Sequence, residues 1–181
     1  MHRLQKITRV DEEVARAGAP QVFALQSGSD LLAKLEWEIE QLRQHVGGLS
    51  AEPIAYAAFN CAVAAWQMVD WAWCDDHPGR APKGREVEEF GDRLRAESRA
   101  LDICESLANS AKHRARRQKQ INAAVSTRMA AAIQHFRCGD PCGRALSAYE
   151  WRLTVTFRDQ QLPLLGVFDE ALAFWNQRMR P

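Results

Sequence analysis

Apolar residues recur at helical spacing in the first third of the chain. Steps of three and four separate the members of the first such series, which are Leu32, Leu35, Ile39, Leu42 and Val46. Residues that suit a helix N-cap precede this series at 27–30, and a glycine pair that can end a helix follows at 47–48. The pattern predicts an amphipathic helix between these two signals, with Lys34 and Glu38 paired on its solvent-facing side.

A second segment, from Ala55 to Trp73, is apolar except for Asn60, Gln67 and Asp70. Its length approaches a bilayer span, but an unpaired aspartate in such a helix costs about 2.5–3.5 kcal/mol and alanine contributes little transfer energy. A buried central helix of a bundle is therefore favoured over a membrane span.

The three polar residues of this segment share one helix face. If that face is buried, each unsatisfied group costs about 1–3 kcal/mol, so partners are expected on a neighbouring helix.

The rest of the chain predicts further helices and a small β element. A third helical region begins near Arg85 and reaches at least Lys112, and a break near Ser98 would split it in two. Residues 118–145 stay open between strand and helix. Alternation over 151–158 predicts a half-exposed strand, and a closing helix follows Gly166. We expect one mainly α domain over residues 1–181: a four- or five-helix bundle with a small β element before the C-terminal helix, and an irregular segment at 1–26.

Charge is balanced over the whole chain but not along it. The 181 residues carry 24 Lys+Arg and 23 Asp+Glu, a net charge of +1, which argues against a uniformly basic nucleic-acid binder. Yet no acidic residue occurs from Ser106 to Gly139, and seven basic residues do: Lys112, Arg114, Arg116, Arg117, Lys119, Arg128 and Arg137. This segment fits a phosphate-binding patch, and equally a solvated helix end whose cations complement the helix dipole.

Targeting signals and cysteine usage point to a reduced compartment. The first residues lack the apolar core of a signal peptide, and the five cysteines are odd in number and spread along the chain. We expect a cytoplasmic protein with buried thiols. His135, Cys138 and Cys142 form a poor zinc pattern without paired C-x-x-C elements, so neither a metal centre nor a cofactor is predicted.

The chemistry-bearing candidate is the pair Asn109 and His113. Residues four apart lie side by side on a helix, so the amide can orient an imidazole that acts as general acid or base. The alternative is a structural histidine that hydrogen-bonds a neighbouring helix.

The stretch Ala108-Asn109-Ser110-Ala111-Lys112-His113 resembles the R-N-x-x-x-H motif of HEPN-type helical bundles, a superfamily that includes prokaryotic toxin and phage-defence ribonucleases. Asn60 to Trp71 together with Cys104, Leu107 and the same stretch is also similar to small uncharacterised bacterial bundle proteins. The HEPN resemblance implies RNA as ligand, with the motif's arginine and histidine acting at the scissile phosphate. Ala108 occupies the arginine position, so the group that would stabilise phosphate charge is absent and metal-independent cleavage is not expected.

These observations predict a HEPN-like protein that binds RNA or a nucleotide around His113. Asn109 and His113 are the candidate catalytic residues, and the candidate nucleic-acid contacts are Lys112, Arg114, Arg116, Arg117 and Lys119. One alternative is a non-enzymatic interaction module, such as an immunity or antitoxin-like partner or a homodimer. Its anchor would be an exposed tryptophan, either Trp71 or Trp73, because these two cannot face the same way on a helix. Another is a divergent ribonuclease that takes its arginine from Arg99 or Arg114.

Overall fold

The computed structural model describes residues 25–46, 50–112, 125–135 and 147–179. They form five helices and one three-stranded sheet: α2 Gly28–His45, α3 Ala51–Asp76, α4 Arg85–Glu97, α5 Arg99–Lys112, β1 Val125–His135, β2 Ser147–Phe157, β3 Gln160–Pro163 and α6 Leu164–Arg178. The predicted fold class, a mainly α protein with a small β element before the last helix, is confirmed.

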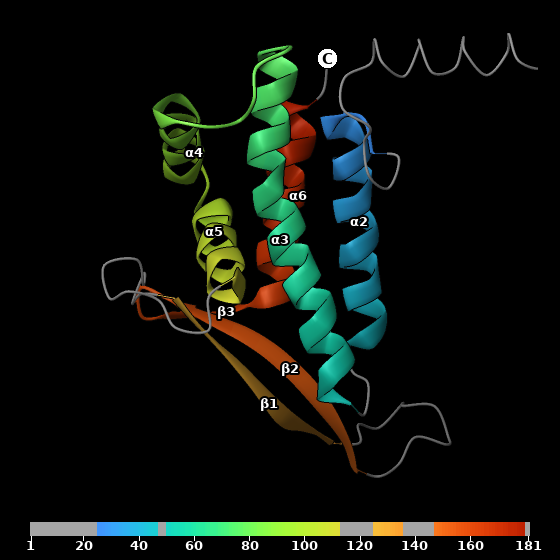
Figure 1. The fold of residues 1–181 in the computed structure, drawn as a ribbon. Helices are drawn as coiled ribbons and strands as arrows, with labels where there is room; N and C mark the ends of the chain where they lie inside the picture. The colour runs from blue at the N-terminus through green and yellow to red at the C-terminus, as the bar shows by residue number, and fades with distance from the viewer. Residues whose placement is uncertain (1–24, 47–49, 113–124, 136–146, 180–181) are drawn as a thin grey trace, which may run out of the picture.

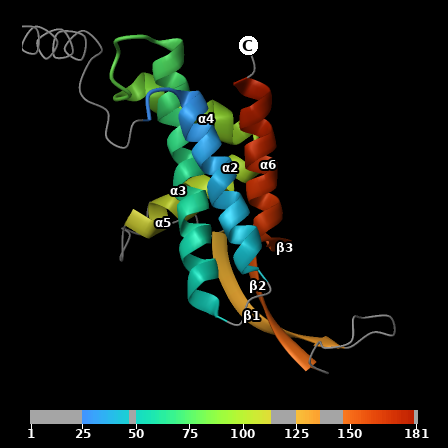
Figure 2. The ribbon, with the colours of Figure 1, turned by 90° about the vertical axis from the view of Figure 1, so that its right-hand side faces the viewer.

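The long helix α3 is the centre of the fold. Helices α2 and α6 pack beside it, α5 crosses it on another side, and the β1–β2 hairpin reaches past its first turns (Figures 1 and 2). Side chains from all of these helices meet in one core, where Leu35, Met68 and Phe168 have no exposed surface. Within the described residues, no helix combines the length and hydropathy needed to cross a bilayer. The choice of a bundle helix for the Ala55–Trp73 segment is therefore confirmed.

Helix α2 begins with a reciprocal cap. The Ser27 hydroxyl accepts from the Asp30 backbone N–H, and the Asp30 carboxylate accepts from the Ser27 backbone N–H at 2.9 Å. A hydrogen bond from the Gln26 backbone N–H is the largest contribution that lowers the pKa of Asp30. Capping chemistry thus fixes the start of this helix at the residues that the sequence offered for it.

The predicted solvent-facing position of Glu38 is wrong. Glu38 is only 5% exposed, and its carboxylate accepts from the Lys34 ammonium at 2.7 Å. The reason is that α2 packs against both α3 and α6, so more than one of its faces is covered. The i,i+4 pair that the sequence predicted does form, but it neutralises a buried carboxylate and is not a pair of two exposed side chains.

Replacement by alanine is expected to have opposite effects at two helix glycines, Gly28 of α2 and Gly166 of α6. The Gly28 N–H donates to Asp75 Oδ2 at 3.1 Å, and an added Cβ would lie 2.5 Å from Asp75 Oδ2 and from Met179 Cε. Gly28→Ala is expected to destabilise the protein by about 1–2 kcal/mol, because both side chains must move and the hydrogen bond is lost. Gly166 in α6 has nothing within 4 Å of such a Cβ.

Gly166→Ala is accordingly expected to stabilise the protein by about 0.5–1 kcal/mol, through the lower conformational entropy of the unfolded chain. Urea unfolding of both variants measures the difference. Equal shifts of the same sign would contradict this account of the contact between Gly28 and Asp75.

The break near Ser98 is confirmed. Ser98 adopts an extended conformation, with φ −134° and ψ 111°, between α4 and α5. Its backbone N–H donates to the Leu94 carbonyl at 2.9 Å, and its hydroxyl accepts from the Leu101 N–H at 3.4 Å. The serine therefore ends one helix and begins the next.

The β1–β2 hairpin includes part of residues 118–145, for which the sequence left strand and helix open. Antiparallel pairing runs from Val125↔Phe157 to His135↔Ser147, so residues 130–133 belong to a strand and not to a helix. Val155 and Phe157 are buried against the bundle, whereas Arg128 and Arg152 are exposed. One face of the sheet thus covers the helices and the other faces solvent.

The polar stripe of α3 is the clearest departure from expectation. Asn60, Gln67 and Asp70 are exposed, so the face that they share is not a buried one. The helix packs against α2, α6 and α5 on one broad side, and the stripe lies on the other side. Of the two tryptophans expected to face different ways, Trp73 is buried and Trp71 is half-buried, as predicted.

Candidate nucleic-acid interface

The last turns of α5 carry the predicted site. Asn109 is half-buried, and its side-chain amide donates to the Glu105 carboxylate one turn earlier on the same helix. Lys112 is the final residue of α5, and its side chain lies outside the described residues. His113 lies outside them too, so its pairing with Asn109 stays a prediction. The structure thus places Asn109 near acidic residues of α5 rather than alone on its face.

The remaining predicted contacts follow α5 directly in the chain. Arg114, Arg116, Arg117 and Lys119 lie outside the described residues, in the stretch 113–124 between α5 and β1. The two ends of that stretch are placed: α5 ends at Lys112, β1 begins at Val125, and the two elements contact one another. The stretch that carries these residues therefore joins two elements that contact one another.

Ala108 occupies the position at which the HEPN motif has an arginine. Its side chain is 2% exposed and packs inward. A longer, charged side chain at this position would either displace core residues or bury a charge, and both are unfavourable. An arginine at this position would therefore not fit the packing of α5 without rearrangement.

Arg99 does not compensate for that missing arginine. It begins α5, ten residues before Asn109, which is about 15 Å along a helix. Its guanidinium donates to both carboxylate oxygens of Glu170 at 3.2 Å. Of the two arginines considered for a divergent ribonuclease, Arg99 is therefore directed to α6 rather than to the end of α5.

The side of α5 that faces α4 carries an ion-pair network. Arg95 of α4 lies 4.0 Å from Asp102 and 3.9 Å from Glu105, and Arg158 lies 3.6 Å from Asp102. Burial of the Arg95 guanidinium lowers its pKa, but Asp92 and these two carboxylates outweigh that effect and raise it. Arginine side chains thus lie close to both Asp102 and Glu105 of α5.

Two arginines lie on the outer face of the hairpin, one on β1 and one on β2. Arg128 of β1 pairs with Thr154 of β2, and Arg152 is the next outward residue along β2, diagonal to Arg128. The Thr154 hydroxyl donates to the Arg128 carbonyl at 3.3 Å and accepts from the Gln161 amide at 3.0 Å. Ser126, Thr154 and Thr156 share this outer face, and the position that follows Arg152 on the same face of β2 is Glu150.

Arg152 was missed as a site residue. Alternation had placed it on the polar side of its strand, but its position beside Arg128 depends on strand register, which a sequence of this kind does not fix. A charge count along the chain finds Arg128 in the acid-free segment and leaves Arg152 outside it, because Asp140 ends that segment. Pairing of the strands is what joins the two arginines.

The described cysteines behave as buried structural thiols. Cys61 and Cys104 have no exposed surface, and burial raises the pKa of Cys61 to about 12. Burial also raises the pKa of Cys104, and that of the half-buried Cys74. Cys61 and Cys104 therefore stay protonated at neutral pH, and neither is a candidate nucleophile. Of the poor zinc pattern, Cys138 and Cys142 lie outside the described residues, as does the side chain of His135.

Comparison of the chain with protein-family models, with curated proteins and with solved structures gives no match.

Proposed function

We propose that this protein binds RNA on a surface formed by the basic segment after α5 and by the outer face of the β1–β2 hairpin. The observation that carries the proposal is the diagonal placement of Arg128 and Arg152 on the outer face of paired strands, with Arg128 inside the acid-free segment from Ser106 to Gly139. Phosphate contacts from arginine and lysine supply most of the affinity of such surfaces.

The threonine and glutamine side chains of the same face suit this ligand. Hydroxyl and amide groups hydrogen-bond to phosphate oxygens and to the ribose 2′-hydroxyl, which distinguishes RNA from DNA. The resemblance to HEPN-type bundles supports the same ligand. Ala108, buried where the motif has arginine, supports binding without cleavage.

The direct test is fluorescence anisotropy of a labelled 20-nucleotide single-stranded RNA at low salt, with the purified full chain. We expect saturable binding, weakened in both His113→Ala and Arg116→Ala, and intact RNA after incubation. A DNA of the same sequence and free ATP serve as competitors. Absence of binding at low salt, or wild-type affinity in both variants, contradicts the proposal, and displacement by ATP at equal concentration would replace RNA with a nucleotide.

A second candidate is self-association, favoured by large apolar side chains on the surface. Trp37 is 58% exposed and Tyr56 is 68% exposed, which is unusual for residues that gain most from burial. Neither lies on the hairpin, so the two candidates concern different surfaces. Light scattering at micromolar concentration separates them: a dimer that Trp37→Glu or Tyr56→Glu dissociates would establish this second function, and a monomer would exclude it.

A further inference from the structure

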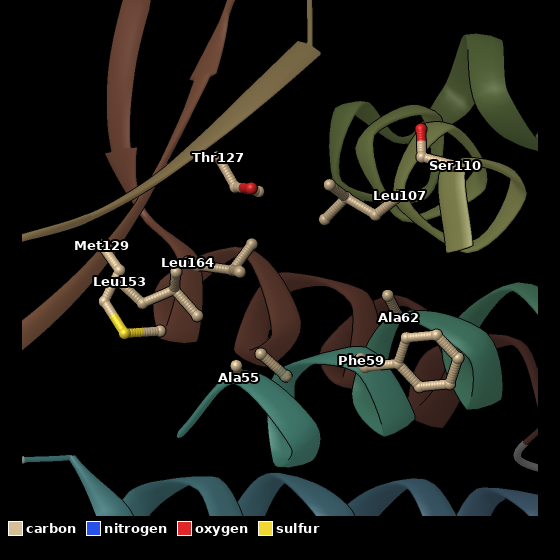
Figure 3. A pocket seen from close by; sticks show the side chains of 10 residues that line it. Ala55, Phe59, Ala62, Leu107, Ser110, Thr127, Met129, Leu153 and Leu164 are labelled. Atoms are coloured by element: carbon tan, nitrogen blue, oxygen red, sulfur yellow. The ribbon is translucent and has the colours of Figure 1, made fainter. Parts of the chain in front are cut away.

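A cavity of about 310 Å³ lies where α3, α5, the hairpin and α6 meet (Figure 3). Its floor is α3, whose Ala55, Ala58 and Ala62 face it at steps of three and four residues. Larger side chains at these three positions would fill the space. The hollow therefore results from the alanine-rich sequence of α3, packed under a sheet that bridges it.

The walls of the cavity are apolar. Leu107 of α5 stands on one side, and Leu153 and Leu164 stand on the other (Figure 3). Leu107 and Leu153 are only half-buried, so apolar surface is left accessible to a ligand. No charged side chain is among the lining residues that the structure describes. An ionised ligand would lose its hydration there without gaining a partner, which selects for a neutral one.

Two side chains on opposite sides suit an aromatic ring. Figure 3 shows Met129 on one side of the space and Phe59, which is 51% exposed, on the other. A thioether contacts the edge of an aromatic ring favourably, and a phenyl ring does so by stacking or by its edge. The size agrees as well: a cavity of about 150 Å³ holds benzene, so this one holds about two fused rings.

The polar contribution comes mainly from one threonine. The Thr127 hydroxyl of β1 points into the space, whereas Ser110 directs its hydroxyl to the Ser106 carbonyl, to which it donates at 2.7 Å (Figure 3). A threonine hydroxyl both donates and accepts. One hydrogen-bonding group on the ligand would therefore have a partner at this position.

We propose that this cavity is a binding site for a neutral, planar aromatic molecule of about two rings that carries one hydrogen-bonding group. The site lies on the inner side of β1, while Arg128 faces outward. The two proposed sites therefore lie on opposite faces of β1, and failure of one proposal does not affect the other.

The test uses 2-naphthol as probe and titrates the full chain by calorimetry. We expect saturable binding of one molecule per chain, and an affinity at least about tenfold lower for Ala55→Phe, which places a ring in the space from an exposed position. Ala33→Phe is the matched control, because Ala33 is exposed on α2 and does not line the cavity. It is expected to bind like the wild type.

Two further ligands and one isosteric variant test the chemistry. Thr127→Val keeps the shape and the strand propensity, and should weaken 2-naphthol about threefold to tenfold while leaving naphthalene unchanged. 2-Naphthoate should bind more weakly than 2-naphthol, because none of the lining residues that the structure describes is a cation. The proposal is overturned if 2-naphthol does not saturate, if Ala55→Phe binds it like the wild type, or if the naphthoate binds as tightly.

Discussion

A variant that lacks three of the basic residues after α5, Arg114→Ala/Arg116→Ala/Arg117→Ala, is expected to bind single-stranded RNA on the order of a hundredfold more weakly at 50 mM salt. Each phosphate contact contributes a salt slope of about −0.7 for single strands, so three contacts amount to more than two decades of affinity at that ionic strength. Anisotropy titration with the same RNA measures the change.

The matched control removes the same charge elsewhere. Lys83, Arg85 and Arg93 are exposed and lie in α4 and the turn before it, away from the hairpin (Figure 1). Replacing these three by alanine should leave RNA affinity within about twofold of the wild type, since contacts beyond a Debye length are screened. If both triple variants lose affinity equally, net charge rather than a localised surface governs binding, and the proposed interface is wrong.

The largest effect on stability is expected for Trp175→Ala. Trp175 of α6 has no exposed surface, and its indole N–H donates to the Ala65 carbonyl of α3 at 3.0 Å. Removing a buried aromatic side chain costs about 3–5 kcal/mol, a large part of the 5–15 kcal/mol that a domain has. For a chain of this length, the melting temperature should fall by roughly 10 °C.

Two variants show which contact is responsible. Trp175→Phe keeps most of the ring but loses the hydrogen bond, and should cost about 1–2 kcal/mol. Trp37→Ala removes the same side chain from the surface, where Trp37 is 58% exposed, and should cost less than about 1 kcal/mol. Chemical unfolding that ranks the two alanine variants equally would contradict the placement of α6 in the core.

Helix positions were predictable because periodicity and capping signals agreed. The series that includes Leu35, Ile39 and Leu42 marked the buried face of α2, and Ser27 marked its start. Glu38 was misplaced because period alone says which residues share a face, whereas how many neighbours cover a helix depends on the fold. The exposed Asn60 and Gln67 were misplaced for the same reason: an alanine-rich helix does not reveal which of its sides stays uncovered.

Strands were harder to predict, for identifiable reasons. β1 contains three successive alanines at 130–132, which favour helix by propensity, and only pairing with β2 makes them a strand. β3 was missed because the turn before it lacks glycine and asparagine. Arg158 and Asp159 adopt φ of 46° and 66°, conformations that a two-residue hairpin requires but that these residue types do not signal.

The candidate site residues were likewise predictable where they depend on local spacing, and not where they depend on the fold. Local spacing identified Asn109 and the cations that follow it, because neighbours on one helix are neighbours in sequence. It could not find Arg152, whose position beside Arg128 depends on register between strands. Nor could it find the cavity, because the residues that enclose it come from five separate elements.

The central claim is that the hairpin's outward arginines and the basic segment bind one RNA together. Its most direct test is the salt dependence of RNA affinity for the wild type and for Arg128→Ala/Arg152→Ala. Because both arginines contact phosphate in this account, the slope of log K against log salt should become shallower by about 1.4 in the double variant, with weaker binding at low salt. A double variant whose slope and affinity equal those of the wild type would contradict it.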